Sequence, residues 1–375
     1  MRAKPEDVRL VLGGVEWKGW KSCQIVRSVD AMAGAFAFGV TDRWQEGALP
    51  LPFAPGMACS VTAGGEPMIK GYVDRVDHSL TQGDHSIGIN GRDASADLVD
   101  CSAVHEPGSW KNMKLSALCA ELAAPFGVPV KLEAEEGAVF PAYSIQPGET
   151  AAEAMQRLLK QRELLAMPDG AGGLRLAKLG QKVRRTALEQ GRNVLEAQAS
   201  FNAEELFSLY VCTGQKQGSD SAFGKACSVR GAVEDAETGR YRPLVLRPSQ
   251  QGEAGYMRQR AQWEKTSRRS KALTVTVTVQ GWRDEDGVLW TPGDLVPVRL
   301  PLFFIEAQLL IAGVTYSKGS HGTTARLELR EAASFMQEPA DSSGSGSGAG
   351  GNPWAVWVKQ AKEAKASGQK VKEFV

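Results

Sequence analysis

The sequence predicts an α+β protein that is predominantly β, with two related small β-barrels and an α+β insertion between them. Three observations predict this class. Residues 1–92 and 181–338 contain short runs of alternating apolar residues between Gly- and Pro-rich turns, which is typical of strands. Residues 93–180 change to apolar residues at helical spacing. A loose repeat of turns and strands indicates that the two β-rich regions are related.

The first β-rich region contains three strand candidates. Val8, Leu10 and Leu12 occupy alternate positions, so they share one face of an extended chain. Residues 36–40 and 86–91 are the second and third candidates, and turns rich in glycine and proline separate them. We expect these strands to form the first barrel.

The insertion begins with a predicted helix that ends at Pro125 and Gly127, because these residue types terminate helices. The apolar residues at helical spacing are Leu115, Leu118, Cys119 and Leu122. A segment of this kind favours a compact unit with its own core.

A second helix is predicted after Gly148. Thr150 and Glu153 have the spacing of a capping box, in which two side chains satisfy backbone N–H groups that the helix leaves unpaired. The predicted apolar face consists of Met155, Leu158, Leu159 and Leu165. A turn at 168–170 and a strand at 174–176 complete the insertion.

The last β-rich region is expected to form the second barrel, with additional α+β elements. Its clearest strand is residues 273–279, where valines occupy one face and threonines the other. A turn follows at 284–287, and further strand candidates lie at 309–311 and 326–329.

Two series of motifs occur in the same order in the two β-rich regions. The first series is Pro55-Gly56, Val61, Ile69-Lys70-Gly71 and an alternating strand that ends at Arg92. The second is Pro292-Gly293, Val298, Ile311-Ala312-Gly313 and an alternating strand that ends at Arg330. The spacings differ by several residues, so chance similarity between β-proteins with many glycine turns is the alternative. A true repeat would mean that the chain contains two related barrels.

Residues 339–352 are predicted to be a flexible Gly/Ser linker, followed by an amphipathic helix at 353–375. Asn352 suits the N-cap and Pro353 the first helical position. The predicted docking face consists of Trp354, Trp357, Val358 and Ala361. Two exposed tryptophans favour docking on another subunit or protein, and folding back on the same chain is the alternative.

Composition argues against several classes of function. The formal net charge is +1, whereas proteins that grip nucleic acid usually carry a basic excess. The six cysteines form no Cys-x-x-Cys pair, and no zinc-protease, serine-hydrolase or phosphate-loop motif occurs. We therefore predict no catalytic residues, no metal and no cofactor. No apolar run reaches the roughly 20 residues that span a bilayer, and no signal peptide is evident, so cytoplasmic folding is expected.

Two features favour a different reading, a cell-wall enzyme or wall-binding protein. Glu133, Glu135 and Glu136 form an acidic cluster, although glycosidases need two carboxyls that converge across a cleft. Residues 143–150 resemble the start of a LysM peptidoglycan-binding module, in which Gly148 and Thr150 also have structural explanations.

Residues 91–102, with Gly91-Arg92-Asp93 at their start, resemble the segment after the first barrel in baseplate hub proteins of Mu-like phages. Residues 145–150 and 288–293 follow in the order that this family shows, the latter with Trp290, Pro292 and Gly293. The resemblance covers about residues 1–335; the linker and the tryptophan helix fall outside it.

The resemblance implies a non-enzymatic, ring-shaped trimer. Two similar barrels in each subunit would present six to a six-fold tail tube or distal tail protein, while the other side accepts a three-fold central spike. Other baseplate subunits are further expected partners, and phage DNA would pass through without specific binding. The protein would be assembled in the host bacterial cytoplasm and reside in the virion, without contacting a membrane. A hub of a contractile secretion or bacteriocin device is the alternative within this class.

Overall fold

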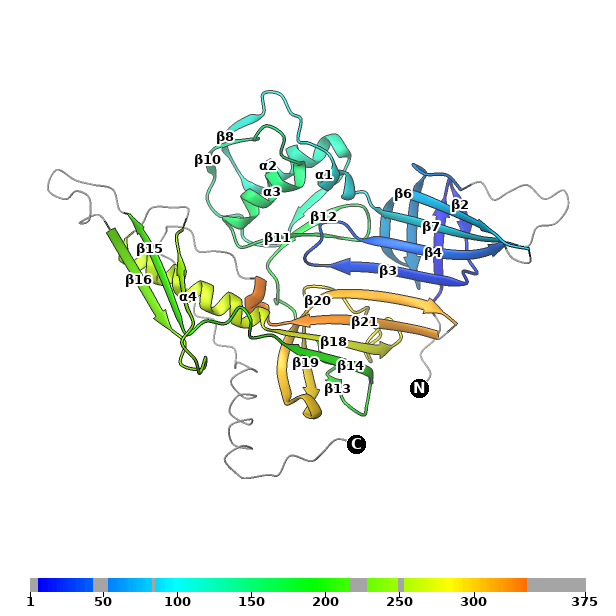
Figure 1. Ribbon diagram of the computed structural model, residues 1–375. Coiled ribbons are helices and arrows are strands. Elements are labelled where there is room, and N and C mark those ends of the chain that lie inside the picture. The colour runs from blue at the N-terminus through cyan, green and yellow to red at the C-terminus, as the bar shows by residue number, and fades with distance from the viewer. Residues whose placement is uncertain are drawn as a thin grey trace, which may run out of the picture.

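A computed structural model describes residues 6–42, 53–82, 85–215, 228–248, 253–320 and 322–335 (Figure 1). These residues form two large sheets, a compact insertion beside them, and a small sheet on a long helix. The predicted linker at 339–352 and the helix at 353–375, with Trp354, Trp357, Val358 and Ala361, lie outside the described residues.

The first sheet has the strand order β3-β4-β7-β6-β5-β1-β2. Its strands are β1 (Val8–Leu12), β2 (Val15–Trp17), β3 (Ser22–Ser28), β4 (Ala35–Asp42), β5 (Ala58–Ala63), β6 (Glu66–Leu80) and β7 (His85–Asp93). The three predicted strands of this region are confirmed. Val8, Leu10 and Leu12 are all buried, because alternate residues of β1 face the core.

The second sheet has the order β14-β18-β21-β20-β19-β13. Its strands are β13 (Leu188–Glu189), β14 (Val194–Phe201), β18 (Leu273–Gln280), β19 (Leu295–Leu300), β20 (Ile305–Gly319) and β21 (Gly322–Arg330). The valines of β18 are buried and its threonines are not, as the alternation predicts. Short 3-10 turns lie at Pro301–Phe303 and Ala332–Phe335.

The two sheets join edge to edge. β3 pairs with β20 over Gly313–Lys318, which makes one continuous 13-stranded sheet (Figure 1). The predicted predominantly β class is confirmed, whereas the described strands do not show two closed barrels. Within the described residues β2 and β3, at the two ends of the first sheet, do not pair with each other, because β20 occupies the outer edge of β3.

The insertion packs around its own apolar core. It consists of α1 (Ala96–Asp100), β8 (Ser109–Met113), α2 (Leu115–Ala123), a 3-10 turn (Ala124–Phe126), β9 (Val130–Leu132), β10 (Phe140–Ser144), α3 (Ala151–Lys160), β11 (Leu165–Pro168) and β12 (Leu174–Ala177). Both predicted helices are confirmed, including the capping box of Thr150 and Glu153. The placement of Leu165 on the second helix is wrong. Glu163 adopts a left-handed conformation (φ 55°), so the helix has ended and Leu165 begins β11.

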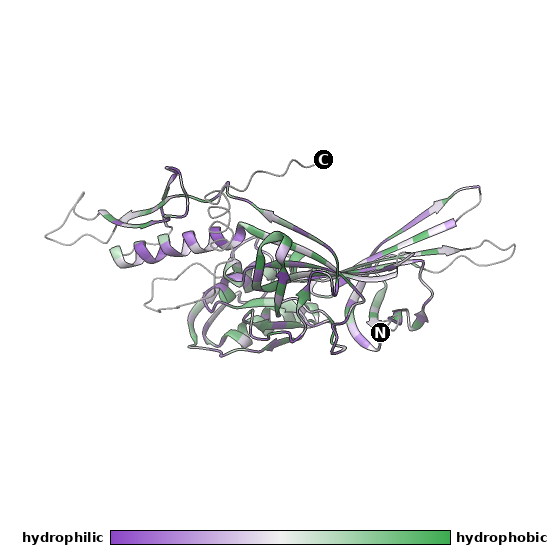
Figure 2. Cartoon of the chain, turned by 90° about the horizontal axis from the view of Figure 1, so that it is seen from below, coloured by the Kyte–Doolittle hydropathy of each residue, from purple (hydrophilic) through white to green (hydrophobic). Residues whose placement is uncertain are grey.

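A small sheet of order β16-β15-β17 packs on the long helix α4 (Ala254–Lys271). Its strands are β15 (Leu209–Gln215), β16 (Ser228–Glu234) and β17 (Pro243–Leu246). Gly231 permits the close approach, since a Cβ there would overlap the backbone of Arg258. Arg269 of α4 pairs with the buried Asp235 beyond β16. Figure 2 shows α4 as a largely hydrophilic helix, which explains why apolar periodicity did not predict it.

Candidate functional site

The first predicted motif lies at the end of β7. Gly91 has no room for a side chain, since a Cβ would overlap the carbonyl oxygen of Tyr72 in β6. Arg92 lies outside the core and forms ion pairs with Asp74 and Asp100, each with an N–O distance of 2.7 Å. The motif therefore brings β6 and β7 close together and ties them to the start of the insertion.

Asp93 completes this motif and is buried. One carboxylate oxygen accepts from the Ser95 backbone N–H at 3.4 Å, and the other has no hydrogen-bond partner in the structure. The Ser95 hydroxyl lies 3.4 Å from the first oxygen but donates to the Met32 carbonyl at 2.8 Å. Burial raises the pKa of Asp93 to about 6. Its backbone N–H donates to the Gly34 carbonyl at 2.9 Å. This side chain stabilises a turn and is not directed into a cleft.

The second predicted motif lies before β19. Trp290 is buried, its carbonyl accepts a hydrogen bond from the buried Tyr316 hydroxyl, and Pro292 is buried beside it. Gly293 has a φ of 95°, a conformation that favours glycine. Its N–H donates to the Ile311 carbonyl at 2.9 Å. The motif is thus a turn that fixes the start of β19 against β20.

Arg184 holds this turn from inside. Its guanidinium contacts Asp284 at 3.0 Å, Asp294 at 2.7 Å and the Leu289 carbonyl. The side chains of Arg184 and Asp284 are only 3% and 2% exposed. Nothing in the sequence distinguishes Arg184 from the other basic residues at 182–185. Its partners Asp284 and Asp294 lie 100 and 110 residues further along the chain, so only the fold brings the three side chains together.

The Pro-Gly turns of the internal repeat are confirmed, but the predicted match of Ile69-Lys70-Gly71 with Ile311-Ala312-Gly313 is wrong, because Val73 takes the place of Ile311. The Gly56 N–H donates to the Val73 carbonyl at 2.8 Å, just as the Gly293 N–H donates to Ile311. In turn, the Val73 N–H donates to the Met57 carbonyl and the Ile311 N–H donates to the Asp294 carbonyl, both at 2.9 Å. Met57 and Asp294 each follow the glycine of their turn. A β-bulge follows at the same place in each long strand, between Val73 and Arg75 in β6 and between Ile311 and Gly313 in β20. Chance similarity does not produce the same turn, bulge and strand order together.

The ends of the two series also correspond. Arg92 of β7 pairs with Ala35 of β4, and Arg330 of β21 pairs with Thr274 of β18, so the two arginines are equivalent. The residues that follow, Asp93 and Glu331, are both acidic. Burial raises the pKa of Glu331 to about 7, and like Asp93 it has one carboxylate oxygen with no partner in the structure.

The junction of β3 and β20 is the largest contact between the two sheets and is reinforced by charged groups. Tyr316 and Ile25 face each other across it and both are fully buried. Arg283 reaches from the second sheet to Glu6 at 2.7 Å and Glu66 at 2.5 Å. Lys318 donates to the Glu6 carbonyl at 2.6 Å. The two sheets therefore form one unit.

The features that favoured wall chemistry have structural roles. Glu136 contacts Lys114 and Ser116, whereas Glu133 contacts Lys131 and Arg175, so the two carboxylates serve separate contacts. In the LysM-like stretch, the Tyr143 hydroxyl donates to the Ala154 carbonyl at 2.7 Å and Glu149 pairs with Arg157 at 2.7 Å. Within the described ranges, no three His, Cys, Asp or Glu side chains are grouped so as to hold a metal ion.

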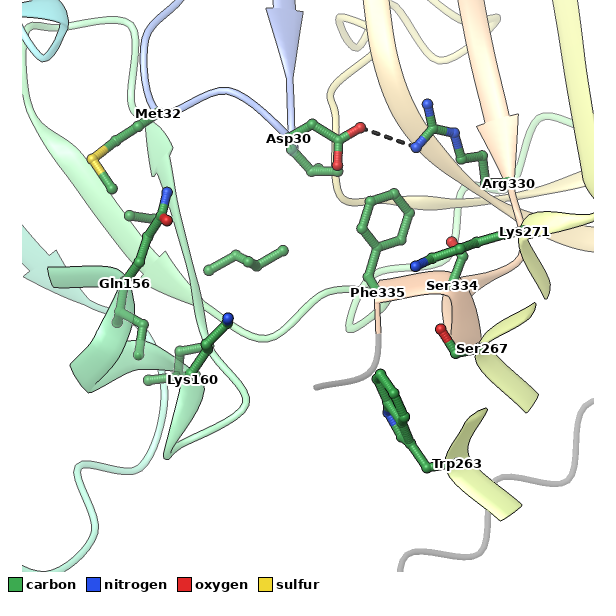
Figure 3. A pocket seen from close by; sticks show the side chains of 15 residues that line it. Asp30, Met32, Gln156, Lys160, Trp263, Ser267, Lys271, Arg330, Ser334 and Phe335 are labelled. Carbon is green, nitrogen blue, oxygen red and sulfur yellow. Dashed lines mark hydrogen bonds and ion pairs between the residues drawn. The ribbon is translucent and has the colours of Figure 1, made fainter. Parts of the chain in front are cut away.

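A cavity of about 410 Å³ lies between the insertion, α4 and the end of the second sheet (Figure 3). Asp30 supplies its single carboxylate among the described lining residues, and Arg330 holds that group at 3.1 Å. The other polar and aromatic residues of the described lining are Gln156, Lys160, Trp263, Ser267, Lys271, Ser334 and Phe335. With the carboxylate of Asp30 alone, the described lining offers no pair of acids. None of the helices in the described ranges is long and apolar enough to cross a membrane.

The described structure therefore contains two equivalent, joined sheets, an insertion between them in the chain, and a small sheet on α4. Residues 95–178 match "Baseplate hub protein gp44-like, second domain", residues 7–93 match "Mu phage baseplate assembly protein GpP-like, N-terminal", and residues 254–338 match "Mu phage baseplate assembly protein GpP, fourth domain". The baseplate hub protein gp44 of Escherichia phage Mu is 31% identical over 317 residues, 82% of this chain and 83% of that protein. The chain belongs to the family of Mu-like phage baseplate hub proteins, as its sequence motifs predicted, and has a structural role in the phage tail.

Solved structures agree with this assignment. The 43 kDa tail protein of prophage MuSo2 from Shewanella oneidensis has a TM-score of 0.79 and 32% identity, covering 88% of this chain and 99% of that one. A tail protein from Neisseria meningitidis MC58 has a TM-score of 0.74 and 23% identity, covering 89% and 99%, and shows the shared fold.

Proposed function

We propose that three copies of this chain form a ring that joins a six-fold tail tube to a three-fold spike. The observation that supports this proposal is the repeat within one chain: two sheets share their strand order, their Pro-Gly turn and their bulge. Three chains would carry 3 × 2 = 6 equivalent sheets. Such a ring presents an approximate six-fold face while its exact symmetry remains three-fold.

The ring is proposed to surround a passage for phage DNA. A formal net charge of +1 is compatible with a channel that does not retain DNA, because many lysine and arginine contacts would make binding tight. The expected partners are the tail tube or distal tail protein on one side and the central spike on the other. Other baseplate subunits would contact the outer surface.

The proposal extends to residues 353–375, whose sequence predicts an amphipathic helix with Trp354 and Trp357 on one face. We infer that this segment docks on a neighbouring baseplate component. Deletion of residues 341–375 should reduce particle assembly or infectivity while the purified protein keeps its oligomeric mass. Unchanged assembly and infectivity would contradict this role.

The solution mass tests the ring itself. The chain weighs 40.3 kDa, so a trimer should weigh 3 × 40.3, about 121 kDa, by light scattering behind a sizing column. Adding purified tube and spike proteins should then give complexes that contain three copies of this chain. A monomer that persists at high concentration and in the presence of both partners would overturn the proposal.

A further inference from the structure

Five strands correspond between the two sheets: β3, β4, β7, β6 and β5 in the first, and β14, β18, β21, β20 and β19 in the second. Beyond them the sheets differ, because β1 pairs with β5 antiparallel, β13 pairs with β19 in parallel, and β2 has no counterpart among the described strands. The second half of β20 pairs with β21 on one side and with β3 on the other. The equivalent half of β6, after the bulge, pairs with β7 on one side only, since β5 pairs with its first half. Among the described strands, none occupies the position beside this half of β6 that β3 occupies beside β20.

The shared bulge fixes which residues are equivalent. Counting from Arg75 in β6 and Gly313 in β20, His78 corresponds to Tyr316 and Ser79 to Ser317. The partner strands agree, because His78 lies opposite Ile87 of β7 as Tyr316 lies opposite Ala325 of β21.

The strand equivalent to β3 is β14, which lies at the end of the second sheet (Figure 1). β3 pairs with β4 and β14 pairs with β18, and these pairings make Gln24 equivalent to Gln198 and Ile25 equivalent to Ala199. The outer edge of β3 is taken by β20. In the part of the chain that the structure describes, no strand pairs with residues 194–200 of β14 along their outer edge.

We propose that β6 of one copy pairs with β14 of the next copy, antiparallel and in the register of the β20–β3 junction. This inference rests on the proposed ring and names its contact. The equivalences place Asp77 opposite Ser200, His78 opposite Ala199, Ser79 opposite Gln198 and Leu80 opposite Ala197. Each copy uses its β6 edge to contact one neighbour and its β14 edge to contact the other. Such a head-to-tail contact closes a ring when the rotation between neighbouring copies is suitable.

Burial supports this pairing. Tyr316 and Ile25 are fully buried at the junction within the chain, whereas His78 is exposed and Ala199 is only half-buried. Leu80, at the end of β6, is 80% exposed. A long open edge invites pairing with another chain, and none of the four proposed residue pairs places like charges opposite each other.

Disulfide trapping tests the register. In a background with Cys101→Ser and Cys227→Ser, the double variant Ser79→Cys/Gln198→Cys places two thiols directly opposite each other on one face of the proposed sheet. Oxidation should convert most of the protein into covalently linked trimers and dimers on a non-reducing gel. The control Ser79→Cys/Ala199→Cys is one residue out of register, so its thiols point to opposite faces and should link at least tenfold less.

The two proposals fail in different ways. A 121 kDa particle in which the in-register pair does not link, or links no better than the control, would overturn the β6–β14 contact and leave the ring intact. A particle that stays monomeric with both purified partners present would overturn the ring and this contact together. Efficient linking of the in-register pair alone supports both.

Discussion

Arg184→Ala would remove the guanidinium that holds the turn before β19. Arg184 contacts Asp284 at 3.0 Å and Asp294 at 2.7 Å, and it also donates to the Leu289 carbonyl. Alanine would leave both carboxylates without their cation, and the Asp284 side chain is only 2% exposed, so water cannot replace the lost contacts. Breaking a buried ion pair from one side typically costs about 3–5 kcal/mol of unfolding free energy.

Arg192→Ala is the matched control. Arg192 also contacts two carboxylates, those of Glu189 at 3.1 Å and Glu285 at 2.8 Å, but its own side chain is 57% exposed. Exposed ion pairs contribute roughly 0–1 kcal/mol, so this variant should unfold nearly as the parent does. The two substitutions remove the same chemical group and differ mainly in burial.

Urea unfolding followed by circular dichroism and tryptophan fluorescence measures the difference. Trp290 contributes to the fluorescence as one of nine tryptophans, and the Arg184 guanidinium carbon lies 5.8 Å from the centre of its ring. For Arg184→Ala, the urea concentration at the midpoint of unfolding should be well below that for Arg192→Ala, while the slope of unfolding free energy against urea stays the same. Equal midpoints, or a cost below about 1 kcal/mol for Arg184→Ala, would refute the assignment of this network as the support of the turn.

Three further predictions concern the first sheet and its free edge. Gly91→Ala should lower the free energy of unfolding by about 1–3 kcal/mol, measured by thermal or urea unfolding, because its Cβ would overlap a carbonyl of β6. Gly88→Ala in the same strand is the control: its Cβ would meet nothing closer than 3.7 Å, so the unfolding free energy should hardly change. Asp93 has its pKa raised to about 6, so its favourable contribution is fully present below about pH 4 and is lost as the pH rises through 6. Urea titrations should show a larger loss of unfolding free energy over this range in the parent than in Asp93→Asn, which keeps only the loss due to Glu331 and other carboxyl groups. Leu80→Asp should weaken self-association at least tenfold, measured by sedimentation, without lowering the melting temperature. Leu302→Asp is the control, since Leu302 is also strongly exposed (74%), and it should change neither quantity. Equal effects of the two substitutions would contradict the role of the β6 edge.

The local pattern of the sequence predicted much of the fold. Alternation placed β1 and β18 correctly, since a period of two in apolar residues buries one face of a strand. Thr150 and Glu153 located the start of α3 because capping depends only on neighbouring residues. Leu165 was assigned to the wrong element, because its spacing suits a helix that the left-handed Glu163 has already ended.

Other features could not be read from local pattern. α4 buries Tyr256, Met257 and Ala261 in its first half but Glu264, Ser267 and Ser270 in its second half, so an apolar periodicity does not run along the whole helix. The pairing of β20 with β3 joins segments that lie far apart in the chain, and nothing near either strand specifies it. The Pro-Gly turns did predict the repeat, although only the hydrogen bonds of Gly56 and Gly293 establish their equivalence. The docking role of the tryptophan helix stays a prediction.

The central claim is that the repeat in one chain becomes an approximate six-fold ring in three chains. Single-particle cryo-electron microscopy of the purified oligomer tests this claim most directly. The account predicts a three-fold particle with six similar sheets, in which β20–β3 junctions within chains alternate with β6–β14 junctions between chains. A particle of another symmetry, or a trimer whose sheets do not alternate around one ring, would contradict it.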